Sequence, residues 1–353
     1  MKQNRGAIED RNILGYTRLV KPHHLKAEMP LTEKAIQTVE NGRDAIRAIL
    51  RGEDNRIILV VGPCSTHDPI ADRDYAERLN ILGQRVEDKM LILKRTYFEK
   101  PRTTIDWKGL INEPYLDGRE MVNDGLRIAR GILAHNAQIG LLSATEFVDP
   151  FVPQWIGDLT SWAAIGARTS QSPTHRQMSS GLSMPIGFKN GTSGDVQAAV
   201  DAVFTASHSQ WFFGIDPTGE PSIVTARGNE DTHLILRGGD NGPNYDSVRV
   251  QAAQELLAKF GLRPNIMIDC SHGNSGKDHE LQPEIFESVF RQIRKGNNGI
   301  IGLMLESNIN PGRQDIPADP KTLQYGVSVT DACIGWDTTE TLIMDAYKSL
   351  ARR

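Results

Sequence analysis

Long apolar segments and cysteine are both scarce in this chain of 353 residues. No apolar stretch approaches the roughly 18–20 residues of a membrane-spanning helix, so we expect no membrane segment. The first residues, Met1–Arg5, lack the apolar core of a secretory signal, and the three cysteines are too few for a disulfide framework. We therefore expect a cytoplasmic protein with reduced thiols.

An excess of positive charge is also absent. The chain has 40 Lys and Arg against 44 Asp and Glu, a formal net charge of -4. This balance argues against a nucleic-acid partner or an anionic membrane surface and is ordinary for a soluble enzyme. We find no low-complexity tract, internal repeat or linker, and we interpret residues 1–353 as a single catalytic domain.

What the chain does contain is a repeated layout, in which a short apolar run ends in charged or metal-binding residues. The eight runs are Ile57–Val61, Met90–Leu93, Leu141–Ala144, Ala163–Ala167, Ile186–Phe188, Leu234–Leu236, Ile266–Ile268 and Ile300–Leu305. Between and around them lie helix-like stretches at 32–51, 69–88, 120–138, 150–161, 194–207, 246–260, 281–295 and 338–351. Alternating strands and helices predict an α/β fold, the (β/α)8 or TIM barrel, whose active site lies at the C-terminal ends of the strands.

Two segments do not fit a plain barrel. Residues 1–54 precede the first run and form an N-terminal extension to a barrel that we place at 55–353. Residues 209–228 contain two extended runs around an Asp-Pro-Thr-Gly turn, which predicts an inserted β-hairpin.

Six basic residues stand at or just beyond the ends of the predicted strands: Arg95, Lys100, Arg102, Arg168, Lys189 and Arg237. A single such residue is usually solvated or paired with a nearby acid. Six at one end of a barrel need anions to neutralise them, because burying an unpaired charge is costly. Arginine binds phosphate and carboxylate with two parallel hydrogen bonds, so the pattern indicates substrates with more than one phosphate.

Candidate metal ligands occur at the same end of the barrel. Cys64, His272 and Glu306 follow or end the first, seventh and eighth runs, and Asp331 lies in the loop after the eighth. Neighbouring strands would bring them together, and such a mixed ligand set accepts Mn, Fe, Co or Zn. No CxxC or HExxH motif supports the assignment, and Cys64 and His272 also suit purely structural roles.

Lys189 admits two interpretations. A lysine at a barrel strand end can form a Schiff base with a carbonyl substrate if burial depresses its pKa. It can also serve as a fixed cation for a carboxylate or phosphate, which its arginine neighbours favour.

Seven motifs give the chain, from about residue 30 onward, a resemblance to a known family. They are Gly62–Ser65, Tyr97–Thr104, Trp107–Asn112, Ile165–Thr169, Gly187–Thr192, Asp269–Asn274 and Thr330–Trp336. Together they resemble the long, feedback-regulated class I synthases of 3-deoxy-D-arabino-heptulosonate 7-phosphate (DAHP), also called phospho-2-dehydro-3-deoxyheptonate aldolases. The resemblance implies condensation of phosphoenolpyruvate with erythrose 4-phosphate, the first step of the shikimate pathway.

The resemblance also implies roles for the residues that match the motifs. One divalent metal ion per subunit would be held by Cys64, His272, Glu306 and Asp331. Phosphoenolpyruvate would be held by Arg95, Lys100, Arg168, Lys189 and Arg237, and erythrose 4-phosphate by Lys100, Pro101, Arg102, Thr103 and Asp331. Lys100 would act as a general acid, and Glu146 or His272 would orient the water that attacks.

Regulation and assembly are further implications of the resemblance. An aromatic amino acid, most readily tyrosine, would bind away from the active site at Asp149, Pro153, Gln154, Leu182, Ser183, Gly214 and Val224. Gly214 favours tyrosine because it leaves room for the extra hydroxyl, although it could instead serve only the hairpin turn. Inhibition by phenylalanine and an unregulated enzyme are the alternatives. The family implies a homodimer or homotetramer, and the aromatic residues of the hairpin suit an interface.

Two interpretations outside a metal-dependent synthase stay open: a Schiff-base aldolase that uses Lys189, and a non-catalytic barrel that binds an effector. The chain departs from the family pattern at Asp106, Gln171 and Pro173, which puts substrate affinity and assembly in question. No implied metal or phosphate position is lost.

Overall fold

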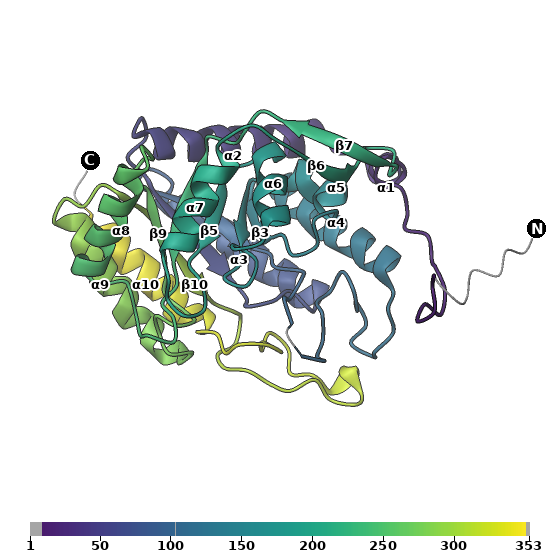
Figure 1. Ribbon diagram of the computed structural model, residues 1–353. Coiled ribbons are helices and arrows are strands. Elements are labelled where there is room, and N and C mark those ends of the chain that lie inside the picture. Colours follow the sequence, from purple (N-terminus) through teal and green to yellow (C-terminus); the bar gives the residue numbers. More distant parts are fainter. Residues whose placement is uncertain (1–8, 103, 351–353) are drawn as a thin grey trace, which may run out of the picture.

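Eight parallel strands close into a barrel in the order β1-β10-β9-β8-β5-β4-β3-β2 (Figure 1). This computed structural model describes residues 9–102 and 104–350. The barrel strands are β1 (Ile57–Gly62), β2 (Met90–Arg95), β3 (Leu142–Glu146), β4 (Trp162–Ile165), β5 (Ile186–Lys189), β8 (Thr232–Leu236), β9 (Ile266–Asp269) and β10 (Ile300–Glu306). The predicted (β/α)8 barrel is confirmed, and every predicted run contributes a strand.

The helices surround the barrel. They are α1 (Pro22–Glu28), α2 (Glu33–Arg51), α3 (Pro69–Val86), α4 (Val122–Ile139), α5 (Pro153–Ile156), α6 (Pro173–Gly181), α7 (Gln197–Ala206), α8 (Ser247–Lys259), α9 (Gln282–Arg294) and α10 (Trp336–Ser349). The prediction missed α1 and α6. In α6 the only large apolar residue is Met178, so its sequence carries no helical apolar period. The helix predicted at 150–161 is the short α5, followed by a 3-10 turn at Gly157–Leu159.

Helix α2 closes the N-terminal end of the barrel. Its buried residues Ile46, Ile49 and Leu50 share a core cluster with Ile58 and Leu142 at the starts of strands. Gly42 allows this close approach, since a Cβ there would lie 2.3 Å from a methyl group of Leu142. The opposite end of the barrel, at the C-terminal ends of the strands, is where an active site is expected. No helix in the described part of the chain is long and apolar enough to cross a bilayer.

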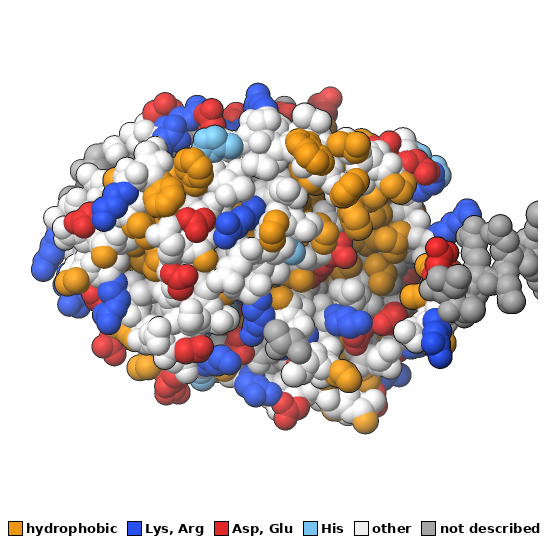
Figure 2. Space-filling model, viewed as in Figure 1, with side chains coloured by type: hydrophobic (Ala, Val, Ile, Leu, Met, Phe, Trp, Pro, Cys, Tyr) orange, Lys and Arg blue, Asp and Glu red, His pale blue; other side chains and the backbone are white. Residues whose placement is uncertain are grey.

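The predicted hairpin insertion is confirmed as the two-stranded sheet of β6 (Gln210–Ile215) and β7 (Pro221–Ala226). Its turn closes where the Gly219 amide donates to the Asp216 carbonyl at 2.9 Å. The hairpin lies outside the barrel beside α6 (Figure 1). Its outer face exposes Trp211, Phe213 and Ile223, and Figure 2 shows hydrophobic side chains gathered over this region.

A buried histidine inside the barrel gives a pH-dependent prediction. His233 in β8 accepts a hydrogen bond from the Trp162 indole at 3.2 Å, and burial lowers its pKa from 6.5 to about 4. The unfolded chain therefore takes up a proton between these values while the folded chain does not, so stability falls as pH falls from about 6.5 to about 4. Between pH 7 and 5 this effect amounts to roughly 2 kcal/mol.

The variant His233→Gln keeps an acceptor for Trp162 but has no group that titrates at position 233. As the pH is lowered from 7 to 5, we expect its free energy of unfolding to fall by about 2 kcal/mol less than that of the wild type. Reversible urea unfolding at both pH values measures the difference. Equal losses in the two proteins would show that His233 does not have this depressed pKa.

Candidate active site at the barrel mouth

Three of the four predicted metal ligands meet where β1 and β10 end. One ligand atom from each of Cys64, Glu306 and Asp331 lies within 4.8 Å of the others. Gly62 pairs with Glu306 across the two strands, which places Cys64 beside the carboxylate. The loop after β10 brings Asp331 back, and the Cys64 amide contacts the Cys333 sulfur at 3.4 Å.

His272 stands at the edge of this cluster. It follows β9 in a left-handed conformation, with φ of 55°. Its Nε2 lies 3.6 Å from Glu306 Oε1, and its Nδ1 lies 2.9 Å from Asp269 Oδ2. The four donors thus comprise one sulfur, one nitrogen and two carboxylates, a set that suits a borderline divalent cation.

Glu306 supplies a direct test of whether a cation fits. Its Oε1 is buried without a hydrogen bond in the described part of the chain. Arg95 Nη2 lies 3.0 Å away, without hydrogen-bond geometry. A buried carboxylate oxygen that faces a thiol and an imidazole and lacks a donor is well placed to bind a metal ion.

The acids of this cluster respond to their surroundings in different ways. Burial and the nearby Glu306 charge raise the pKa of the Cys64 thiol. Burial alone would raise the pKa of Asp331, but the neighbouring His272 imidazole and the Lys100 ammonium lower it. The carboxylate is therefore ready to bind a cation, whereas the thiol requires one to ionise.

Lys100 reaches the mouth from the loop after β2, and Arg102 lies two residues further along the same exposed loop. Lys100 Nζ donates to the Cys64 carbonyl at 2.5 Å and lies 3.1 Å from its sulfur. Arg102 lies 3.2 Å from Asp106, one of the positions that depart from the family pattern. Pro101, between Lys100 and Arg102 in the sequence, is half-buried. Thr103 lies outside the described residues.

Arg95, at the end of β2, is buried beneath this loop. Its Nη1 donates to the Cys64 carbonyl at 2.6 Å, and its guanidinium lies 3.7 Å from the centre of the Tyr97 ring. Arg95 therefore fixes the backbone of one candidate ligand and faces the carboxylate of another, Glu306.

Two arginines on the other side of the mouth lack counter-ions. Arg237 is buried and Arg168 is exposed, and neither has a carboxylate within 4.0 Å among the described residues. Burial lowers the pKa of Arg237, and the positive charge of Arg168 lowers it further. Such a pair is expected to bind an anion.

Lys189 is already paired. At the end of β5 its ammonium lies 2.9 Å from Asp269 Oδ2, and both side chains are buried. Burial alone would raise the pKa of Asp269, but His272 and Lys189 lower it well below its usual range.

Glu146 ends β3 and is buried at the mouth. A side chain at Gly166 would collide with its carboxylate, since a Cβ there would lie 2.2 Å from Glu146 Oε1. No hydrogen bond holds this carboxylate within the described part of the chain, so it can orient a water molecule.

The sequence did not reveal several residues that organise the site. Asp269 and Glu99 are buried acids with partners far along the chain, Lys189 of β5 for Asp269 and the loop after β3 for Glu99, which sequence spacing does not show. Glu99 accepts hydrogen bonds from the amides of Val148 and Asp149 at 3.2 and 3.0 Å, and burial raises its pKa to about 8. It thereby ties the loop that carries Lys100 to the end of β3.

Three buried asparagines connect the ends of β5, β8 and β9. Asn190 accepts from the Arg237 amide at 2.8 Å and from Asn244 at 3.1 Å. Asn274 accepts from the Asn244 amide and donates to the Asp269 carbonyl, both at 2.8 Å. These bonds hold Lys189, Arg237 and Asp269 in one frame.

The predicted effector residues fall into two groups. Leu182, Ser183 and Val224 line a cavity of about 680 Å³ between α2, the end of α6 and the hairpin. The others, Asp149, Pro153, Gln154 and Gly214, are not among its lining residues. Gln154 nevertheless contacts the hairpin, donating to the Ile215 carbonyl at 3.1 Å.

Gly214 lies within β6 opposite Ser222, and not in the hairpin turn. The alternative that it serves only the turn is therefore wrong. A Cβ at this position would lie 2.8 Å from a methyl group of Val224, so a larger residue would force that side chain to move.

A closed parallel barrel whose mouth holds a thiol–carboxylate cluster and, among the described residues, arginines without counter-ions defines a class of enzyme, the (β/α)8 barrels that act on anionic substrates. A family model described as "DAHP synthetase I family" matches residues 28–344, and the chain belongs to this family.

Individual relatives agree over nearly the whole chain. The chain is 48% identical over 332 residues to the Tyr-sensitive phospho-2-dehydro-3-deoxyheptonate aldolase of Escherichia coli, covering 94% of this chain and 93% of the relative. It is 46% identical over 346 residues to the phenylalanine-inhibited aldolase of Saccharomyces cerevisiae, covering 96% and 93%. A solved aldolase structure from Francisella tularensis has a TM-score of 0.94 at 44% identity, covering 97% of this chain and all of that one.

Proposed function

We propose that the barrel mouth condenses phosphoenolpyruvate with erythrose 4-phosphate and water to DAHP and phosphate, with residues 1–353 acting as one catalytic domain. The observation that carries the proposal is that Arg168 and Arg237, which have no carboxylate within 4.0 Å among the described residues, share the mouth with the cluster of Cys64, Glu306 and Asp331. One side of the mouth requires an anion and the other accepts a cation.

Phosphoenolpyruvate is assigned to the cationic side. Arg168 and Arg237 bind its phosphate, and Arg95, Lys100 and Lys189 surround its carboxylate and enol. The Lys189 ammonium is buried beside the Asp269 carboxylate, which holds it in one position next to the assigned substrate. Two bidentate guanidinium groups suit a phosphate better than any single contact does.

Erythrose 4-phosphate is assigned to the loop after β2 and to Asp331. Arg102, with Pro101 and Thr103, receives its phosphate, and Asp331 lies near its hydroxyls. The Arg102–Asp106 ion pair is exposed and therefore weak, so a phosphate can displace it. The two substrates then meet between Lys100 and Lys189.

Cys64, His272, Glu306 and Asp331 would hold one divalent ion, for which Mn, Fe, Co and Zn all suit the donors. When bound, such an ion supplies Lewis acidity toward a carbonyl oxygen.

Each remaining step has a residue near it. Carbon 3 of phosphoenolpyruvate forms a bond to the aldehyde carbon, and Lys100 donates a proton to the aldehyde oxygen. Glu146 orients the water that adds to carbon 2, since the ring nitrogens of His272 already face Asp269 and Glu306. The bond between carbon 2 and the phosphate oxygen then breaks, which forms the carbonyl of DAHP and releases inorganic phosphate. One proton of the water replaces the proton given by Lys100, and the other leaves with the phosphate. Holding both anions in place supplies much of the acceleration.

A Schiff-base aldolase that uses Lys189 predicts a different experiment. Borohydride would then reduce the imine between Lys189 and the carbonyl substrate, leaving the substrate covalently attached to Lys189. We expect no such adduct by mass spectrometry, because the Lys189 ammonium is paired with Asp269 at 2.9 Å. We also expect a chelator to inactivate the enzyme and a divalent metal to restore it; an adduct at Lys189 would contradict the proposal.

Feedback inhibition by tyrosine is proposed at the hairpin. A Cβ at position 214 would lie 2.8 Å from Val224, so Gly214→Ser crowds the side chain that is assigned to the effector. We expect this variant to raise the tyrosine concentration for half-inhibition at least about tenfold, in the range that one crowded group costs in a pocket. Thr218→Ala, at the exposed turn of the hairpin and outside the lining of the cavity, serves as the control and should retain normal inhibition. Stronger inhibition by phenylalanine or tryptophan, or an unchanged Gly214→Ser, would refute the tyrosine assignment.

A homodimer or homotetramer is proposed to form through the hairpin. Trp211, Phe213 and Ile223 are 69%, 84% and 69% exposed on one face, which a second subunit would cover. We expect light scattering at micromolar concentration to give an oligomer and Phe213→Asp to shift it toward monomer. Ile81→Asp, at an exposed position of α3, is the control. A monomeric wild type would contradict this assembly.

A further inference from the structure

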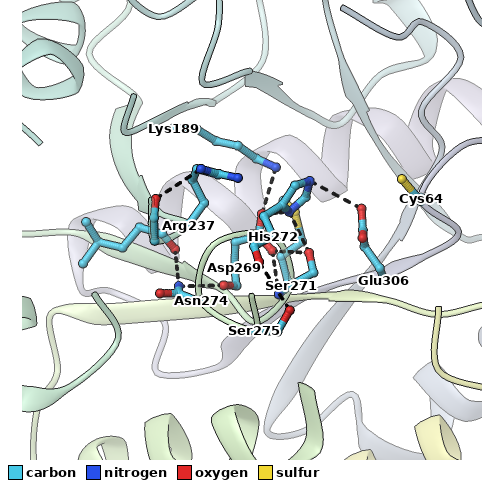
Figure 3. Close-up of polar contacts among 12 residues, drawn as sticks. Cys64, Lys189, Arg237, Asp269, Ser271, His272, Asn274, Ser275 and Glu306 are labelled. Atoms are coloured by element: carbon cyan, nitrogen blue, oxygen red, sulfur yellow. Dashed lines mark hydrogen bonds and ion pairs between the residues drawn. The ribbon is translucent and has the colours of Figure 1, made fainter. Parts of the chain in front are cut away.

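The Asp269 carboxylate makes four polar contacts within the site. It is fully buried at the end of β9. Its Oδ1 accepts hydrogen bonds from the Ser271 amide at 3.0 Å and from the Ser271 hydroxyl at 2.6 Å. These two bonds fix the carboxylate and direct its other oxygen toward two functional groups, as Figure 3 shows.

The second oxygen, Oδ2, lies 2.9 Å from Lys189 Nζ and 2.9 Å from His272 Nδ1. One carboxylate oxygen therefore touches a residue of the anion side and a residue of the metal side. Within the described residues, its contacts belong to the site and not to the apolar core.

The contact with His272 determines which ring nitrogen carries the proton. A carboxylate can only accept, so Nδ1 must be the protonated nitrogen. Ser271 agrees with this assignment: its hydrogen is directed to Asp269, which leaves its oxygen free to accept from Nδ1 at 2.7 Å. The lone pair of Nε2 is then available on the side of Glu306, 3.6 Å away.

The contact with Lys189 has a different consequence. A buried ammonium needs an anion close by, and Asp269 supplies one before any substrate binds. The ammonium is thereby held at the end of β5, next to the frame that the buried asparagines make with Arg237. Asp269 is the only carboxylate within 4.0 Å of this ammonium among the described residues, and the Tyr97 ring, 5.9 Å away, is a much weaker partner.

We propose that Asp269 is a positioning residue that serves both halves of the site: it sets the tautomer of His272 for the metal and fixes Lys189 for phosphoenolpyruvate. The inference rests on the proposed function. It predicts that one substitution weakens the binding of two chemically different ligands that do not share a protein ligand.

The test uses Asp269→Asn, which keeps the shape but turns an acceptor into a donor toward Lys189 or His272. Binding of Co²⁺ alone is followed by absorption, and binding of phosphoenolpyruvate to the metal-free protein by calorimetry. We expect Co²⁺ affinity to fall about 10–100-fold, as for other outer partners of metal ligands, and phosphoenolpyruvate affinity to fall as well. The KM for erythrose 4-phosphate should change much less.

A double-mutant comparison separates positioning from general damage. In a Lys189→Met background, Asp269→Asn should weaken phosphoenolpyruvate no further but should still weaken Co²⁺. If both affinities survive Asp269→Asn while the wild type binds both ligands, the positioning role is refuted. If the wild type binds neither, the proposed function fails instead.

A measurement on the wild type keeps the inference testable even if Asp269→Asn does not fold. Nitrogen-15 spectra of the metal-free protein, with His272 assigned by comparison with His272→Asn, report its tautomer. We expect the proton on Nδ1 when the ring is neutral. A proton on Nε2 would overturn the proposal.

Discussion

Replacing Cys64 with alanine is expected to abolish metal binding and condensation while leaving the barrel folded. Cys64 offers the only sulfur among the candidate ligands, and its ligand atom lies within 4.8 Å of those of Glu306 and Asp331. Changes to outer partners of metal ligands cost about 10–100-fold in affinity, so loss of a ligand should cost more than about 100-fold. The void left by one buried sulfur should cost only about 1 kcal/mol of stability.

Metal content after dialysis, the rate of DAHP formation and the unfolding midpoint test this expectation together. Cys270→Ala is the matched control, because Cys270 is equally buried but belongs to the apolar core. It should keep its metal and activity. A fully active Cys64→Ala enzyme would show that the cluster is not the metal site.

Lys100→Met is expected to lower kcat by about 10²–10⁴-fold, the usual contribution of a general acid. The Lys100 ammonium lies 3.1 Å from the sulfur of Cys64, a member of the candidate metal cluster. We propose that the aldehyde oxygen of erythrose 4-phosphate binds at this cluster, so Lys100 is close enough to protonate it. Methionine keeps the length of the side chain without the proton or the charge. The KM of both substrates should also rise, because Lys100 is assigned to both.

The pH profile distinguishes an acid from a merely binding cation. Loss of the acid should remove the alkaline decline of kcat, whereas loss of binding alone should leave the profile in place. Lys259→Met, at the exposed end of α8, controls for the loss of one lysine and should behave as wild type. An unchanged kcat in Lys100→Met would exclude the role of general acid.

The barrel could be predicted because its strands are buried on both faces. Such strands appear as continuous apolar runs, and parallel strands bring their C-terminal ends to one mouth. This rule alone placed Cys64 beside Glu306. It did not place Asp331, whose position depends on the loop after β10 returning to contact Cys64 through Cys333.

Other features carried too weak a signal in the sequence. The sequence of helix α6 has almost no apolar face, so its pattern is typical of a loop. The contact of α6 with the hairpin is seen only in the folded structure. Asp269 stands at the end of an apolar run, three residues before His272, but its other partner, Lys189, is known only from the closed barrel. Likewise, the cavity lined by Leu182, Ser183 and Val224 forms only where α2, α6 and β7 meet.

A stoichiometric assay of the purified protein with phosphoenolpyruvate and erythrose 4-phosphate tests the proposed reaction most directly. We expect each DAHP formed to consume one molecule of each substrate and to release one inorganic phosphate. We also expect the reaction to stop in chelator and to resume on adding Mn²⁺, Fe²⁺, Co²⁺ or Zn²⁺. Full activity in the metal-free protein, or no DAHP with any of these four ions, would refute a metal-dependent condensation at the barrel mouth.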